Sequence, residues 1–141
     1  MRTALVVLAG LLASCSASRV HELHIDRAFT ADERGALFSA AARWNDVSTS
    51  QIVITDDDAN GEIVRRAPAR ENAFATTERE HVEISAGLAP EIFKHVAMHE
   101  LGHVLGLHYS PNGVMRCDGS TYPLDLTSED VEECRRVGAC D

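Results

Sequence analysis

The feature that most constrains this chain is the segment HELGHVLGLHYS, residues 99–110. Residues four apart in a helix lie on one face, so a helix through this segment points His99 and His103 toward a single ion, with Glu100 beside them. The apolar residues around them favour a buried helix, and Gly106 is typical of a helix end. The segment therefore predicts a metal site built on one helix, after which the chain turns away.

The H-E-x-x-H spacing also predicts a chemistry. Imidazole is a common zinc ligand, and a carboxylate beside the metal can take a proton from the water that attacks a peptide carbonyl. We therefore take His99 and His103 as candidate zinc ligands and Glu100 as the candidate general base. A bare H-E-x-x-H also occurs by chance, but the apolar helix, the following glycine and a further histidine strengthen the hypothesis.

At these residues the chain resembles the metzincin metallopeptidases, and most closely their matrixin-like branch. The family pattern is H-E-x-x-H-x-x-G-x-x-H, followed by a methionine in a tight turn under the metal. His99, Glu100, His103 and Gly106 match it, and Met115 within PNGVM looks like the Met-turn. Residues 36–55 are similar to the family's first helix and strand, and residues 126–131 to the start of its last helix.

The resemblance implies a zinc-dependent endopeptidase with one catalytic Zn²⁺ and a protein or peptide substrate. It also implies an α+β, zincin-like fold, in which a twisted, mostly parallel sheet of about four strands packs with an active-site helix, a backing helix and a short C-terminal helix. An edge strand would pair with the extended substrate. Two alternatives are an inactive metzincin-fold binding module and a zinc-holding lipoprotein. Glu100 favours the enzyme, because holding zinc requires no general base.

The match to the family breaks at the third ligand. Family spacing puts the third histidine at position 109, where this chain has Tyr109, and His108 comes one residue early. Neutral imidazole is a better zinc ligand at neutral pH than a phenol with a pKa of about 10. We therefore favour His108, brought to the metal by a small shift of the chain after Gly106. Tyr109 is the alternative third ligand, and Asp118 is a remote option.

Local patterns predict the remaining elements. Thr30 and Glu33 form a capping-box pattern before a helix over residues 31–47, in which Trp44 faces the core. Short β-branched or apolar runs predict strands at 51–55, 62–66, 73–76 and 81–85, and Pro90 suits the first turn of the helix that carries the histidines. A last helix begins within residues 126–130, where Thr127 or Ser128 can cap it.

The acidic run at residues 56–58 lies between two of the predicted strands. We interpret it as a solvated turn. Structural calcium is the alternative there, but the run lacks the alternating ligands and the distal glutamate of an EF-hand loop.

The first residues are typical of an export signal. A basic start is followed by ten apolar residues, 4–13, a run too short to span a bilayer. The sequence from Leu12 to Cys15 resembles the lipobox of bacterial lipoproteins, which implies that Cys15 carries lipid. We therefore expect a signal peptide at 1–14, a lipidated N-terminus and lead-in at 15–29, and a metzincin-like catalytic domain at 30–141.

This division makes the protein an exported lipoprotein of the bacterial cell envelope. Ser16 is neutral for inner-membrane retention and so favours the outer membrane. An ordinary secretory signal cut near Ala17 is the alternative. A net charge of −9 without a Lys/Arg cluster argues against nucleic acid as a partner.

Cysteine use fits an oxidising compartment. With Cys15 lipidated, three cysteines remain and allow one bridge. We expect Cys117 to pair with Cys134 or Cys140, because the longer loop stabilises more than the short loop that joins Cys134 to Cys140.

Overall fold

The computed structural model describes residues 18–67, 74–116, 118 and 122–141. Five strands form one sheet in the order β2-β1-β3-β5-β4. Four strands run parallel: β1 (Val20–Ile25), β2 (Gln51–Thr55), β3 (Gly61–Arg66) and β5 (His81–Ser85). The last, β4 (Ala75–Glu78), is antiparallel to β5 and forms one edge of the sheet.

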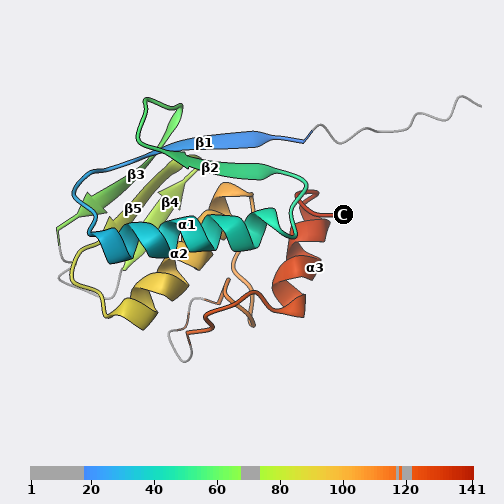
Figure 1. Cartoon of the computed structure of the whole chain (residues 1–141). Coiled ribbons are helices and arrows are strands. Elements are labelled where there is room, and N and C mark those ends of the chain that lie inside the picture. Colours follow the sequence, from blue (N-terminus) through green and yellow to red (C-terminus); the bar gives the residue numbers. More distant parts are fainter. Residues whose placement is uncertain (1–17, 68–73, 117, 119–121) are drawn as a thin grey trace, which may run out of the picture.

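Three helices accompany the sheet: α1 (Ala31–Asn45), α2 (Pro90–Val104) and α3 (Ser128–Arg136). Figure 1 shows α1 and α2 on one face of the sheet and α3 near the C-terminus, beyond the end of α2. The predicted class, α+β with a mostly parallel sheet and three helices, is confirmed at this level.

The core lies between the sheet and the two long helices. Alternate strand residues point toward the helices and are fully buried, namely Leu23, Ile25, Ile63, Val82 and Ile84. From α1, Trp44 enters the same core as predicted, and its indole Nε1 donates a hydrogen bond to the Met98 carbonyl of α2 at 2.8 Å. This bond fixes the helix that carries the histidine pair against α1.

Strand β1 was not among the sequence predictions, which placed residues 15–29 in a lead-in segment and expected about four strands. It is a central strand, paired in parallel with both β2 and β3. The sequence VHELHI does not show the alternation of apolar and polar residues that is typical of a strand, because histidine and glutamate interrupt the apolar residues. His21 lies on the buried face with Leu23 and Ile25, and its Nδ1 contacts Glu80 Oε1 at 2.8 Å.

The predicted boundaries of the other elements are close to those observed. The capping box of α1 is present, with Thr30 and Glu33 bonded reciprocally, but the helix ends at Asn45 rather than at residue 47. The Asn45 side chain exchanges two hydrogen bonds with the backbone of Ile52 in β2 and so turns the chain into the sheet. The predicted strand 73–76 is β4 at 75–78, and residue 73 lies outside the described residues.

The expected cysteine pairing is wrong for the described residues, because the disulfide joins Cys134 to Cys140. Helix α3 ends at Arg136, and Gly138, with φ +79°, turns the chain back on itself. The two Cα atoms are therefore only 5.2 Å apart. Cys140 also forms an isolated antiparallel bridge with Ser48, which ties the C-terminus to the segment between α1 and β2.

Several predictions concern the N-terminus. The signal peptide, Cys15 and Ser16 lie outside the described residues, as does Cys117. Within the described part of the chain, no helix is long and apolar enough to cross a membrane.

Candidate metal centre

The histidine pair sits in the last two turns of α2. This helix begins with Pro90 in its first turn and ends in a Schellman motif, in which the Leu107 amide donates to the Gly102 carbonyl at 3.0 Å and the Gly106 amide to the His103 carbonyl at 2.9 Å. Gly106 has φ +91°, a conformation that favours glycine. The chain therefore reverses at the predicted position and folds back over the end of the helix.

Both histidines are oriented by backbone carbonyls. His99 Nδ1 donates to the carbonyl of Val114 at 2.7 Å, and His103 Nδ1 donates to the carbonyl of Leu107 at 2.7 Å. A carbonyl can only accept, so the proton of each neutral ring is on Nδ1 and the lone pair is on Nε2. The two Nε2 atoms face each other at 3.1 Å.

Both rings favour the neutral form. Burial lowers the pKa of His99 to about 4, although its hydrogen bond to Val114 acts in the opposite direction, and burial also lowers the pKa of His103. Two neutral rings then bring two lone pairs together at 3.1 Å, an arrangement that is unfavourable without a shared cation. Two nitrogens bound to one tetrahedral zinc lie about 3.4 Å apart. The pair therefore fits a zinc ion.

Glu100 lies beside this pair and is 6% exposed. The hydroxyl of Thr77, in β4, donates to Glu100 Oε2 at 2.5 Å. Burial raises the pKa of Glu100 to about 7, while the Thr77 hydrogen bond and the charge of Arg66 lower it. A carboxyl group with a pKa near 7 is suited to exchange protons at neutral pH.

A turn at residues 113–115 contacts the histidine pair through the backbone carbonyl of Val114, which accepts from His99. Val114 and Met115 are fully buried, and their backbone amides donate to the carboxylate of Asp130 at 3.0 and 3.3 Å. Asp130, itself fully buried, also accepts from the backbone amide of Thr127 at 2.8 Å in the capping box of α3. One carboxylate thus joins α3 to the turn whose Val114 carbonyl orients His99.

Met115 packs against Gly102, on the turn of α2 between the two histidines. A Cβ atom at Gly102 would lie 2.5 Å from Met115 Sδ and 3.0 Å from Trp44 Cζ2. Glycine is therefore needed for this close approach. Met115 is therefore buried against the helix that carries the pair, and its assignment as a Met-turn residue stays a prediction.

Of the two candidate third ligands, Tyr109 lies beside the pair. Its ring centroid is 5.6 Å from that of His99 and 4.9 Å from that of His103. His108 is exposed, and its backbone amide is hydrogen-bonded to Glu133 of α3. Tyr109 is also exposed, at 66%, but its ring contacts both histidine rings, and Leu107, which follows the reversal at Gly106, is buried.

Histidine, cysteine and acidic side chains are the usual ligands for a third position at zinc. Among the described residues, no group of three or more His, Cys, Asp or Glu side chains is placed to hold a metal. His108 is exposed and acts on His103 through its charge, while Asp118 is exposed and paired with Arg116. Tyr109 remains as the side chain that contacts both histidine rings.

The third histidine of this helix, His95, is a neighbour of the pair. His95 is buried, its ring centroid is 6.0 Å from that of His99, and its Nδ1 donates to the Pro123 carbonyl at 3.0 Å. The ring of Tyr122 packs edge-on against it at 5.3 Å. These two side chains form a wall next to the metal centre.

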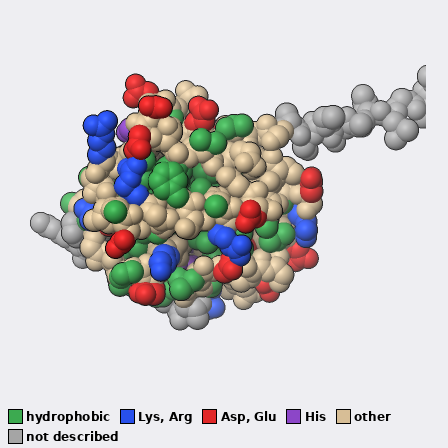
Figure 2. All heavy atoms as spheres, in the orientation of Figure 1, with side chains coloured by type: hydrophobic (Ala, Val, Ile, Leu, Met, Phe, Trp, Pro, Cys, Tyr) green, Lys and Arg blue, Asp and Glu red, His purple; other side chains and the backbone are tan. Residues whose placement is uncertain are grey.

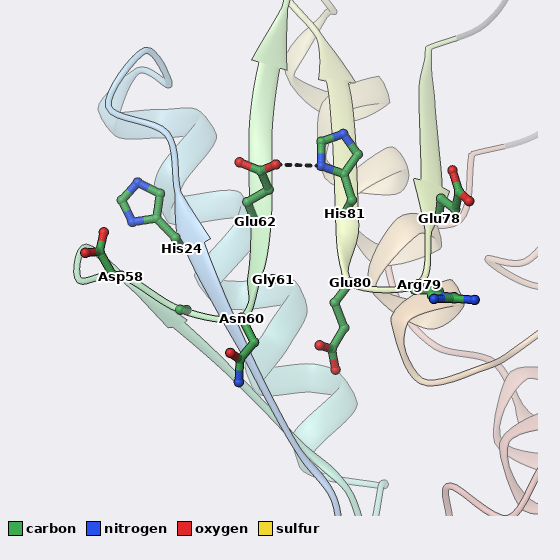
Figure 3. A pocket seen from close by; sticks show the side chains of 10 residues that line it. His24, Asp58, Asn60, Gly61, Glu62, Glu78, Arg79, Glu80 and His81 are labelled. Atoms are coloured by element: carbon green, nitrogen blue, oxygen red, sulfur yellow. Dashed lines mark hydrogen bonds and ion pairs between the residues drawn. The ribbon is translucent and has the colours of Figure 1, made fainter.

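A separate cavity of about 520 Å³ lies where β1 ends and β3 and β5 begin. Figure 3 shows Glu62 and His81 side by side on neighbouring strands at the cavity, with Asp58 near His24. His81 contacts Glu62 through Nδ1 at 2.8 Å and Glu83 through Nε2 at 3.2 Å. The cavity includes no residue of the H-E-x-x-H segment, and the described residues around it form no metal-binding group.

The acidic run at residues 56–58, predicted to be a solvated turn, is exposed. Asp56 pairs with Arg34 at 2.6 Å, and the Asp57 amide is capped by the Thr55 hydroxyl at 3.0 Å. These contacts are those of a solvated turn stabilised by its neighbours.

Two residues of the centre were missed by sequence reasoning. Asp130 is not among the predicted site residues, although its place three residues after Thr127 is a capping-box signal. Thr77 lies in a four-residue strand, and no sequence pattern connects it to Glu100. Both act through contacts that join distant segments.

Comparison with protein-family models and with curated proteins found no match to this chain.

Proposed function

We propose that this protein is a zinc-dependent endopeptidase with a zincin-like, metzincin-type catalytic domain. The observation that carries the proposal is the pair of Nε2 lone pairs of His99 and His103, 3.1 Å apart, together with the buried carboxyl group of Glu100, the residue after His99 in the same helix. Zinc held there supplies a Lewis acid that activates water for attack on a carbonyl at neutral pH.

Each side chain has its own part in this proposal. His99 and His103 hold the metal, and the carbonyls of Val114 and Leu107 keep their rings in the required tautomer. Glu100 takes the proton of the attacking water and passes it to the leaving amine. Tyr109 is proposed for the third ligand position because its ring contacts both histidines, and His108 is the alternative.

The substrate is proposed to be an extended peptide. Strand β4 is at the edge of the sheet and contacts α2 through Thr77 and Glu100; in the described part of the chain its outer edge pairs with no other strand, and we propose that the substrate backbone pairs there. A peptide paired with this edge would pass Glu100 in an extended conformation.

A buried Glu100 favours an enzyme over a zinc-holding protein. A carboxyl group at 6% exposure costs stability when it ionises, and binding zinc does not require it. Such an unfavourable group is more readily explained by chemistry at the metal than by storage.

The substitution Glu100→Gln tests the proposal. It keeps the size and the helix but removes the base, so peptide hydrolysis should fall by at least ~100-fold while zinc stays near one per chain. Zinc content by atomic absorption and cleavage of a denatured protein substrate give the two measurements. Hydrolysis that persists undiminished in the variant would refute the mechanism, and zinc binding without hydrolysis by the unaltered protein would favour the zinc-holding alternative.

A further inference from the structure

Strand β4 contributes one hydroxyl to the environment of Glu100. Within Ala75–Glu78, Ala75 and Thr77 are partly buried while Thr76 and Glu78 are exposed, as strand alternation requires. Thr77 pairs with Val82 of β5, which is fully buried, so the side chain of Thr77 lies on the helix-covered face of the sheet. From there its Oγ1 donates to Glu100 Oε2 at 2.5 Å.

This contact joins two segments that the sequence separates. The donor lies 23 residues before Glu100. Within the described part of the chain, no other side chain donates a hydrogen bond to the Glu100 carboxyl group, which is almost entirely buried. The orientation of this group is therefore set by the Thr77 hydroxyl and the packing around it, and the charge of Arg66 also acts on it.

We propose that Thr77 is a positioning residue for Glu100, an inference that rests on the proposed peptidase function. A glutamate side chain has three rotatable bonds, and a base must be held close to one geometry to act efficiently. The hydroxyl occupies Oε2 and so fixes the plane of the carboxylate. Oε1 is left as the oxygen that accepts the proton of the attacking water.

A purely structural role is the competing explanation, because the same hydrogen bond also satisfies a buried polar group. The two explanations predict different kinetics. A structural role affects the amount of folded protein, whereas a positioning role lowers kcat for each folded molecule and leaves KM unchanged. If Thr77 acts by positioning Glu100, removing its hydroxyl should no longer lower kcat once Glu100 itself has been replaced.

The experiment compares four variants of the full chain, each loaded with zinc and assayed for peptide cleavage. Thr77→Val keeps the shape and removes the hydroxyl, so kcat should fall by about tenfold or more with KM and zinc content unchanged. Thr77→Ser keeps the hydroxyl and should restore most of kcat. Thr76→Val is the matched control on the exposed face of the same strand and should leave kcat unaltered. In Glu100→Gln, adding Thr77→Val should cause no further loss.

The outcomes separate this inference from the function on which it rests. An active unaltered protein, an inactive Glu100→Gln and a Thr77→Val with full kcat would overturn the role of Thr77 alone. A Thr77→Ser variant as impaired as Thr77→Val would also overturn it, because the hydroxyl would not be the group that matters. An unaltered protein without activity, or a Glu100→Gln with full activity, would overturn the proposed function and this inference together.

Discussion

Glu100 and His99 are adjacent in α2, and burial shifts their pKa values in opposite directions. For Glu100 the folded pKa of about 7 lies above the ordinary 4.5, so the stability it contributes is present below pH 4.5 and is lost as the pH rises through 7. For His99 the folded pKa of about 4 lies below 6.5, so its contribution is present above pH 6.5 and is lost as the pH falls through 4. Between these limits the two effects oppose each other.

Glu100→Gln should therefore stabilise the metal-free protein at alkaline pH. The difference between 4.5 and about 7 corresponds to about 3 kcal/mol of unfolding free energy, which the ionised carboxylate costs above pH 8. The gain of the variant should be small at pH 5 and should grow toward that value at pH 8.5. Urea unfolding in the presence of a chelator measures it, with the exposed Glu91→Gln in the same helix as control. A gain that does not change with pH would contradict the assigned burial effect.

The third ligand is the second question at the scale of single residues. Removing one of three zinc ligands should weaken binding by several orders of magnitude, whereas removing a group that only supports a ligand costs about 10–100-fold. The aromatic contacts of Tyr109 predict that Tyr109→Phe loses zinc on dialysis against a weak chelator and that His108→Ala keeps it. Copper substitution should give a phenolate charge-transfer band that Tyr109→Phe abolishes.

The reverse result would show that the loop after Gly106 shifts and that His108 binds the metal, as the sequence favoured. The choice between His108 and Tyr109 depends on the local backbone geometry, which the chemistry of the two side chains does not predict. Imidazole is the better ligand, but the Schellman turn at Gly106 determines which side chain faces the pair.

At the scale of elements, the contact between α3 and the turn at residues 113–115 depends on one carboxylate. Asp130 accepts hydrogen bonds from the amides of Val114, Met115 and Thr127 and is fully buried. Gly113 lies so close that a Cβ there would be 2.4 Å from the Asp130 carboxylate. The Asp130 carboxylate is therefore packed directly against the backbone of the turn.

Asp130→Asn should therefore lower the unfolding free energy by about 3 kcal/mol, because the new amide turns a donor toward backbone donors. Zinc affinity should also fall by about 10–100-fold, since the Val114 carbonyl that orients His99 is released. Urea unfolding and competition with a zinc indicator measure the two effects. The neighbouring Glu129→Gln, on the exposed side of α3, serves as the matched control. Equal losses in both variants would argue against the specific role of Asp130.

The elements that the sequence predicted are those with a local signal. The capping box at Thr30 and Glu33, the glycine stop at Gly106 and the β-branched strands act within a few residues, and all three appear in the structure. Strand β1 was missed because its partners β2 and β3 come later in the chain and its own residues are half polar. The contacts of Thr77 and Asp130 depend in the same way on packing between distant segments.

The disulfide illustrates a second limit of sequence reasoning. Loop entropy favoured a pairing with Cys117, but a single turn at Gly138 places Cys140 against Cys134. Entropy ranks pairings only when the folded chain can form each of them.

At the scale of the whole molecule, the surface is acidic but mixed. The chain carries a net charge of −9, and Figure 2 shows acidic and basic side chains interspersed with apolar ones over one face. Such a surface does not attract nucleic acid or anionic lipid by charge. We predict that attachment to a membrane depends on the N-terminal segment, where the sequence from Leu12 to Cys15 resembles a lipidation pattern.

Lipid attachment at Cys15 gives the last prediction. Radiolabelled palmitate should enter the protein when it is expressed with its N-terminus intact, and the protein should sediment with membranes. Cys15→Ala should lose the label and leave the membrane fraction, because no other cysteine follows an apolar signal run. Cys117→Ser is the control and should keep both the label and the membrane association. A protein that is unlabelled and remains in the supernatant with Cys15 present would exclude the anchor, and would indicate cleavage near Ala17 and release from the membrane.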